Sequence, residues 1–452
     1  MISLYDTALG EVVPLQLRDP GKVSIYVCGP TVYGPPHIGH GRHTLVYDVL
    51  RRFLVWKGLE VMFVSNITDI DDKIIQRANA EERDWQDIAT KCERIWWKSM
   101  DLYNVQRPDR TPHATEYVTQ MTDLIGELIG AEKAYVTSDG VYLRVTEVPD
   151  YGMLANQNLD DLVEGGGDRS VVGTEKENPA DFALWKFTKP GEPSWSSPWG
   201  DGRPGWHTEC VVMSLDLLGE GFDLHTGGLD LTFPHHENER AQAVANGKMF
   251  ARHWMHHGFV EMEGEKMSKS LGNVKNLLDL AERFDPRAYR LLVLQSHYRS
   301  PMEVTDTSLT NAQSAVVRLD TFARRFAGHS ASPDSGAIAE FDASMSRDLD
   351  TAGVVDLMFR KVREANTALD EGEVAKANTA AATALEIGEV LGLDLRADAV
   401  EVPADIAELV ARRTDARSAK DWTMADQIRD ELTAAGWTVE DSAEGPVARR
   451  LT

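Results

Sequence analysis

The chain has 452 residues, a formal net charge of −25 at pH 7 and only three cysteines. This length predicts two to four domains with a large buried core. Residues 1–19 contain Asp6 and Glu11 and no sustained apolar run, which argues against a signal peptide or membrane span there. The negative net charge repels nucleic acid at long range. Binding depends on local basic patches, however, so the net charge does not exclude a nucleic-acid partner.

An apolar run at residues 23–29 predicts a buried parallel strand, and Pro35-Pro36 stand where a helix would begin. His37 and His40 are three residues apart on the first turn of that helix, so they share one face. The positive end of the helix dipole is where phosphate binds. The pattern predicts two imidazole donors facing a phosphate, although a glycine between two histidines is also typical of an ordinary turn.

An α/β fold with a Rossmann-like, doubly wound parallel sheet is predicted, because strands such as residues 60–64 alternate with helical stretches. Residues 1–117 form its first half. For the acidic cluster Asp69, Asp71 and Asp72 in this half, a role in ordering the loop is favoured over metal binding.

Residues 118–200 are predicted to be an inserted connective subdomain. They contain a helix, a strand at residues 141–145 and a glycine-rich stretch at residues 164–168. The second half of the sheet is predicted for residues 201–300, which include the lysine-rich loop described below.

Four residues with metal-binding side chains are spread over both halves. Cys28 ends the first predicted strand, Cys210 lies in the second half, and His235 and Glu239 are four residues apart. A helix beginning near Pro234 would place the last two on one face. Two sulfurs, one imidazole and one carboxylate suit zinc, but scattered residues of these types are also common in cores, so spacing alone leaves both interpretations open.

Lys266 and Lys269 stand in the string KMSKS of residues 266–270, between Gly264 and Gly272. The glycines predict a loop flexible enough to close, and two ammonium groups would stabilise departing pyrophosphate. Alone, such a string is also typical of a solvated loop. Together with the histidine pair it predicts nucleotidyl transfer.

Helical periodicity from Arg287 to Leu393 predicts a helical bundle over residues 301–395. A polar, proline-containing linker separates it from a last unit, residues 404–452, with two short helices and a hairpin. This unit carries the clearest basic clusters, which are also typical of a solvated helix face: Arg412, Arg413, Arg417, Lys420, Arg449 and Arg450.

The string HIGH of residues 37–40, followed by KMSKS, resembles the signature pair of class I aminoacyl-tRNA synthetases. Further strings at residues 66–74, 190–210 and 227–231 resemble those of the cysteinyl-tRNA synthetase family. The resemblance runs from about residue 22 to the C-terminus. It implies that residues 404–452 form an anticodon-binding domain.

The resemblance also implies roles for individual residues. One Zn²⁺ per chain would be held by Cys28, Cys210, His235 and Glu239. Catalytic roles are implied for His37, His40, Lys266 and Lys269, and ATP contacts for these four together with Gly39, Ser268 and Asp230, the last toward the ribose. Thr68 and Trp206 would be walls of the amino-acid pocket.

The implied reaction joins L-cysteine and ATP, which arrives with Mg²⁺, into cysteinyl-adenylate and pyrophosphate, and then transfers cysteine to the 3′-terminal adenosine of tRNA(Cys). Zinc would select the substrate thiol over the harder, less acidic hydroxyl of serine. With Cys28 and Cys210 on zinc, Cys92 has no disulfide partner, so we expect a reducing, cytoplasmic location. No membrane partner is expected, and the family resemblance implies a monomer.

Two other hypotheses compete. A cysteine:glucosaminyl-inositol ligase of mycothiol synthesis has a similar core, but that family lacks the C-terminal unit. A non-catalytic zinc- or RNA-binding paralogue would keep the fold, but the intact histidine and lysine strings argue against it.

Overall fold

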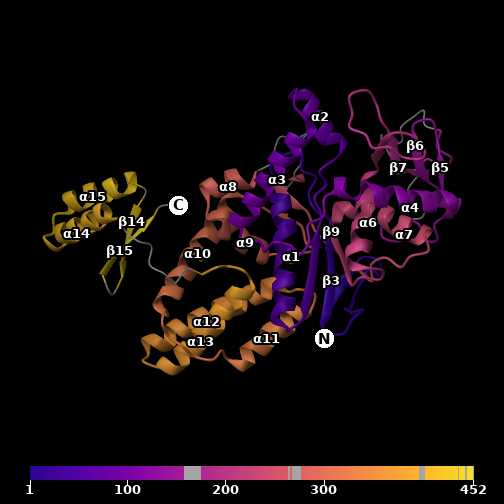
Figure 1. Cartoon of the computed structure of the whole chain (residues 1–452). Coiled ribbons are helices and arrows are strands. Elements are labelled where there is room, and N and C mark those ends of the chain that lie inside the picture. Colours follow the sequence, from indigo (N-terminus) through magenta and orange to yellow (C-terminus); the bar gives the residue numbers. More distant parts are fainter. Residues whose placement is uncertain are drawn as a thin grey trace.

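The structure is a computed structural model that describes residues 1–156, 175–262, 265–266, 276–395, 403–435, 437–442 and 445–450. Its centre is a parallel sheet in the order β10-β9-β3-β4. Apolar residues fill the middle of this sheet, which helices cover on both faces (Figure 1). The strands are β3 (Lys22–Val27), β4 (Glu60–Ser65), β9 (Leu224–Gly228) and β10 (His253–His257).

The two faces of the sheet carry different helices (Figure 1). On one side lie α1 (Ile38–Trp56), α3 (Trp85–Leu102) and α9 (Pro286–Leu294). On the other lie α6 (Trp206–Leu218) and α7 (Glu237–Ala245). The predicted doubly wound α/β fold is confirmed.

The acidic cluster after β4 orders the chain around α2 (Asp72–Ala80). Asp71 caps this helix by accepting from the backbone N–H of Lys73 at 2.9 Å. Asp69 accepts from the backbone and hydroxyl of Thr115 at 3.0 and 2.5 Å. Asp72 pairs with Lys186 at 2.7 Å. The favoured structural role of these three carboxylates is confirmed.

The insertion contains the helix α4 (Val118–Gly130) and a four-stranded antiparallel sheet. Its strands are β5 (Ala134–Val136), β6 (Gly140–Leu143), β7 (Phe182–Phe187) and β8 (Gly202–Pro204). Short 3₁₀ turns occupy Ala114–Tyr117 and Val145–Glu147. The predicted glycine-rich stretch at residues 164–168 lies outside the described residues. Strand β8 leads directly into α6, so the insertion's sheet supports the helix that carries Cys210.

A small three-stranded sheet in the order β12-β11-β13, which we call the lysine sheet, follows β10. It consists of β11 (Val260–Met262), β12 (Glu265–Lys266) and β13 (Met302–Glu303). Strand β13 interrupts the helical periodicity predicted from Arg287 onward. It forms because Met302 N–H donates to the carbonyl of Phe259 at 2.9 Å, a contact between distant segments that local periodicity does not encode.

The helical bundle follows β13. After α8 (Leu277–Arg283) and α9, it contains α10 (Asp306–Arg325), α11 (Ser335–Ser346), α12 (Thr351–Asp370) and α13 (Val374–Val390). Its apolar faces are continuous with the core on the α1 side of the sheet. The N-terminal hairpin β1 (Ser3–Asp6) and β2 (Glu11–Pro14) is tied to the bundle, because Tyr5 N–H donates to Asp348 at 2.8 Å.

The C-terminal unit stands apart from the rest of the chain (Figure 1). It contains α14 (Ala404–Ser418), α15 (Trp422–Ala434), β14 (Trp437–Ser442) and β15 (Gly445–Arg450). The two predicted helices and the hairpin are confirmed. The unit has its own small core of Ile406, Val410, Ile428, Leu432, Trp437 and Ala448. Among the described helices, none is both long and apolar enough to cross a lipid bilayer.

Candidate functional site

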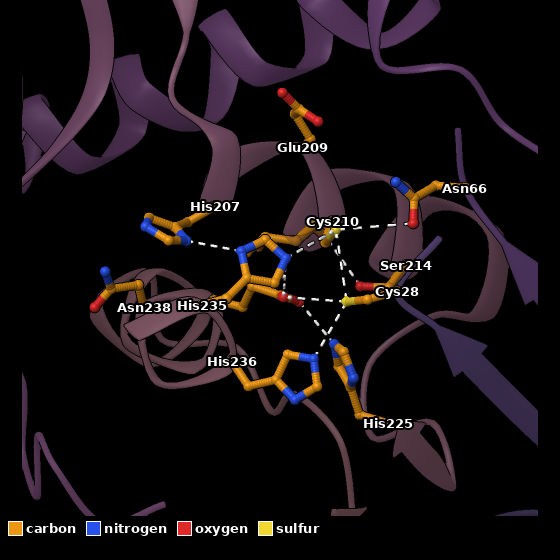
Figure 2. Close-up of polar contacts among 12 residues, drawn as sticks. Cys28, Asn66, His207, Glu209, Cys210, Ser214, His225, His235, His236 and Asn238 are labelled. Atoms are coloured by element: carbon orange, nitrogen blue, oxygen red, sulfur yellow. Dashed lines mark hydrogen bonds and ion pairs between the residues drawn. The ribbon is translucent and has the colours of Figure 1, made fainter. Parts of the chain in front are cut away.

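Four metal-binding side chains meet at the end of β3, although the sequence separates them widely. Cys28 follows β3 directly, Cys210 lies on α6, Glu239 lies on α7, and His235 lies on the turn just before it. One ligand atom from each lies within 4.8 Å of all the others. Cys28, Cys210 and His235 face one another (Figure 2), and the sulfur atoms of Cys28 and Cys210 are 3.8 Å apart. His235 Nε2 lies 3.0 Å from Glu239 Oε1. The structure thus brings together the four predicted zinc ligands.

This cluster is buried and rich in groups that bind cations. Cys28 and Cys210 are buried, and burial together with their mutual contact raises the pKa of the Cys28 thiol well above its usual value. Burial raises the pKa of Cys210 to about 11. Burial lowers the pKa of His235 well below its usual value, so it is a neutral imidazole. Two thiols, a neutral imidazole and a buried carboxylate fit a bound Zn²⁺, which would take the thiols as thiolates.

Two further histidines meet the same cluster from the opposite side (Figure 2). His225 Nε2 lies 2.7 Å from Glu239 Oε2, and His236 Nε2 lies 3.3 Å from the sulfur of Cys28. His225 and His236 also form, with Cys28 and Glu239, a second group whose ligand atoms lie within 4.8 Å of one another. The sequence analysis missed both histidines. The available signals were the pair of adjacent histidines at 235 and 236 and the position of His225 on a strand parallel to the one that ends at Cys28.

A third layer of contacts orients these rings. His207 Nδ1 lies 2.8 Å from His235 Nδ1, and His236 Nδ1 lies 2.7 Å from His256 Nε2. His256 in turn contacts the hydroxyl of Thr7 at 2.7 Å. Partners on the second ring nitrogen fix the orientation of a metal-binding imidazole, and His235 has such a partner.

The phosphate side of the site lies at the start of α1. The backbone N–H of His37, the residue before α1, donates to Nδ1 of His40 at 3.1 Å, and the two rings are 3.8 Å apart. Because Nδ1 of His40 accepts this bond, the neutral ring carries its proton on Nε2. The edge of the His40 ring also packs against Trp96 at 5.7 Å. The two histidines therefore share a face, as predicted.

One cavity of about 340 Å³ joins the two sides of the site. Cys28 lies at its floor, while His37, Gly39 and His40 line the phosphate side. Trp206 lines it with 36% of its surface exposed, and its ring stacks on His235 at 4.0 Å. A ligand in this cavity would touch the thiol side and the histidine side at once.

Two predicted contact residues lie at different depths. Asp230 is exposed and lines the cavity. Thr68 is buried, and its hydroxyl donates to Glu209 at 2.9 Å. The backbone of Thr68 pairs with Pro30, which lines the cavity, so Thr68 lies behind that wall.

The predicted lysine loop is described only in part. Lys266 lies on β12, at the edge of the lysine sheet. Ser268 and Lys269 lie outside the described residues. The first residues of β11, Val260 and the preceding Phe259, line the cavity, so the lysine sheet begins at the site.

Comparisons with known proteins agree with this arrangement. Residues 14–314 match the class I (C) tRNA synthetase catalytic domain, residues 340–396 the DALR domain and residues 399–445 the cysteinyl-tRNA ligase anticodon binding domain. A cysteine–tRNA ligase of Halorhodospira halophila is 43% identical over 100% of both chains. One of Thermus thermophilus is 43% identical over 98% of each.

A solved structure has a similar fold at low identity. Mycobacterium tuberculosis methionyl-tRNA synthetase in complex with methionyl-adenylate superimposes with a TM-score of 0.63 at 16% identity, covering 88% of this chain and 96% of that one. The catalytic domain, the bundle and the C-terminal unit each have a counterpart among these relatives, and the sequence similarity extends over the whole chain. The chain therefore belongs to the cysteine–tRNA ligase family of class I tRNA synthetases.

Proposed function

We propose that the protein activates L-cysteine with ATP, giving cysteinyl-adenylate and pyrophosphate, and then transfers cysteine to the 3′-terminal adenosine of tRNA(Cys). One observation carries this proposal: a buried cluster of two thiols, an imidazole and a carboxylate reaches, through Cys28, the cavity that the His37–His40 turn also lines. The metal-binding cluster would bind the thiol of cysteine, and the His37–His40 turn would bind the phosphates of ATP, the two substrates of cysteine activation.

The cluster would hold one Zn²⁺ per chain through Cys28, Cys210, His235 and Glu239. Bound there, the ion would supply a soft Lewis acid that accepts the substrate thiol as a thiolate and discriminates against serine. The carboxylate of Glu239 is bound on one oxygen by His235 and on the other by His225. His225 therefore fixes which oxygen of Glu239 faces the two thiols.

The phosphate side requires charge stabilisation and no protein nucleophile. His40 would donate from Nε2 to ATP, and both histidines stand at the positive end of the α1 dipole, where the oxygens of ATP would lie. Lys266 and Lys269 would stabilise the charge that develops on pyrophosphate, and Mg²⁺ arrives with ATP. The cysteine carboxylate then attacks the α-phosphorus, so that one P–O bond forms as the bond to pyrophosphate breaks.

The remaining cavity residues would orient the amino acid and the ribose. Trp206, stacked on His235, would cover the substrate side chain. Asp230, exposed at the rim, would accept from the ribose hydroxyls. Thr68 would act from behind the wall, through Glu209 and the backbone of Pro30.

The C-terminal unit, residues 404–452, would bind the anticodon. It has a core of its own, and residues 399–445 match an anticodon binding domain. The amino-sugar ligase is not favoured, because its family lacks this unit. We also propose that the rest of the chain divides into four parts, residues 1–117, 118–200, 201–300 and 301–395.

A direct experiment supplies radiolabelled cysteine and ATP with either tRNA(Cys) or glucosaminyl-inositol as acceptor. The proposal predicts charging of the tRNA alone. Transfer to the amino-sugar, with no charged tRNA, would overturn it.

A further inference from the structure

Arg42, two residues after His40 on α1, has a fully buried side chain. Its guanidinium group binds four backbone carbonyls. Nη1 donates to Phe259 at 2.6 Å, and Nη2 lies within hydrogen-bonding distance of His297, Tyr298 and Ser300 at 3.3, 3.0 and 2.5 Å. These carbonyls come from two chain segments, each more than 200 residues away from Arg42.

No carboxylate among the described residues forms an ion pair with Arg42. A buried cation without a counter-ion is costly, and burial lowers the pKa of Arg42 to about 10. The four carbonyl dipoles offset part of this cost. An apolar side chain would fill the same space without it, so the guanidinium group must serve a purpose that packing does not serve.

The two segments that Arg42 binds are the starting points of the lysine sheet. Phe259 immediately precedes β11, which pairs with β12, the strand that carries Lys266. Residues 297–300 lead into β13, which pairs with β11 on its other side. Arg42, on the helix that follows His37, therefore binds both segments that lead into the lysine sheet.

Gly258 shows how closely these segments meet. Its N–H donates to the carbonyl of Tyr298 at 2.8 Å. A Cβ atom at position 258 would lie 2.6 Å from the carbonyl oxygen of Arg299 and 2.7 Å from that of Ser300. Backbone atoms cannot yield as a flexible side chain would, so even a methyl group here would push the base of the sheet apart.

We propose that Arg42 is a positioning residue for adenylate formation: it fixes the lysine sheet relative to His37 and His40, so that both sets of cations meet one triphosphate. This inference rests on the proposed function. Displacements of about 1 Å cost roughly 10²-fold in rate, which makes such a fixed distance valuable. Arg42 touches no substrate and acts only through the segments it binds.

The test is a double-mutant cycle in ATP–pyrophosphate exchange with Arg42→Lys and Lys269→Ala. A lysine keeps the charge, but its compact ammonium cannot span carbonyls from two segments as the planar fork does. Arg42→Lys alone should slow adenylate formation roughly 10- to 100-fold. In the Lys269→Ala background the same change should cost less than it does alone, because one of the two lysines being positioned is already gone.

Zinc content and equilibrium binding of cysteine without ATP should stay at the wild-type level in Arg42→Lys. Arg290→Lys is the matched control: Arg290 is also fully buried, but it binds Asp48 and the carbonyls of Tyr103 and Leu391. Its effect should be independent of Lys269, so the two losses should multiply.

Gly258→Ala is a second variant that disturbs the same segments while leaving Arg42 intact. It tests the positioning role if Arg42→Lys does not fold. It should reproduce the slow exchange and the same dependence on Lys269. The positioning role would be overturned if Arg42→Lys and Gly258→Ala exchanged at the wild-type rate. It would also be overturned if their losses multiplied with the loss caused by Lys269→Ala, or if they lost zinc in parallel with activity. Absence of cysteine-dependent exchange in the wild type would instead refute the proposed function.

Discussion

The sulfur atoms of Cys28 and Cys210 lie 3.8 Å apart although 182 positions separate them along the chain. Cys28 directly follows a strand of the first half of the sheet, and Cys210 lies on a helix of the second half. A metal ion bound between them would join the two halves of the catalytic domain. Substrate selection and the folding of this domain would then depend on the same ion.

Cys210→Ser should lower zinc content and cysteine activation together, each by roughly tenfold or more, because a hydroxyl replaces one strong thiolate ligand. Elemental analysis and pyrophosphate exchange measure the two quantities. Cys92→Ser removes a buried thiol outside the cluster and is the control. Full activity in a metal-free Cys210→Ser protein would contradict the zinc assignment.

Lys269→Ala should slow adenylate formation roughly 10²- to 10³-fold while cysteine binding changes little, because the lysine acts on charge that develops in the transition state. Single-turnover kinetics with saturating cysteine and ATP provide the measurement. An unchanged rate would show that Lys269 is an ordinary surface residue.

Truncation after Val402 should leave cysteine-dependent pyrophosphate exchange nearly intact, since it removes no proposed catalytic residue and the removed unit has its own core. Aminoacylation should collapse through weaker tRNA binding, on the order of 2–4 kcal/mol. Charging measured over a tRNA titration tests this. Equal charging by both proteins at subsaturating tRNA would remove the anticodon assignment.

Trp422, at the start of α15, exposes 60% of its surface, which is unusual for so large an apolar side chain. We expect it to stack on a base of the anticodon, so Trp422→Ala should weaken tRNA binding by about 1–3 kcal/mol. Trp422→Phe keeps an aromatic face and should recover most of the affinity. Equal tRNA affinity in all three proteins would rule out the stacking.

His113 and Glu93 should stabilise the fold most between about pH 4.5 and 6.5. The hydrogen bond from His113 Nε2 to Glu93, 3.1 Å long, raises the histidine's pKa and lowers that of the carboxyl. Because the pKa of His113 is raised in the folded state, its contribution to fold stability is fully present below the unfolded pKa of 6.5. That contribution is lost as the pH rises through the folded pKa. Because the pKa of Glu93 is lowered in the folded state, its contribution to fold stability is fully present above the unfolded pKa of 4.5. That contribution is lost as the pH falls through the folded pKa.

Thermal unfolding of wild type and Glu93→Gln checks this prediction. The pair is partly exposed, so the difference should be only about 0.5–1 kcal/mol near pH 5.5 and smaller near pH 8.5. A larger difference at the higher pH would contradict the assigned direction of the shifts.

Local patterns predicted the elements that local chemistry determines. The apolar run at residues 23–29 contains most of β3, and the two helices and the hairpin predicted for residues 404–452 are present as α14, α15, β14 and β15. Family membership, read from the HIGH and KMSKS strings, is confirmed. Each of these features repeats with a short period or forms a contiguous motif, so a single sequence contains it.

The missed features depend on contacts between distant segments. His225 reaches Glu239 only after β9 pairs with β3, and Arg42 finds its acceptors only when the lysine sheet has formed. Strand β13 likewise exists because β11 lies beside it. No spacing rule encodes such partners, since they are set by the tertiary fold.

The central claim is that this protein selects cysteine by its thiol. Its most direct test is ATP–pyrophosphate exchange with cysteine and serine in parallel, on protein whose zinc content is measured by elemental analysis. The account predicts about one zinc per chain and cysteine-dependent exchange at least roughly 10⁴-fold more efficient than exchange with serine. Comparable exchange with both amino acids, or full cysteine selectivity in zinc-free protein, would contradict it.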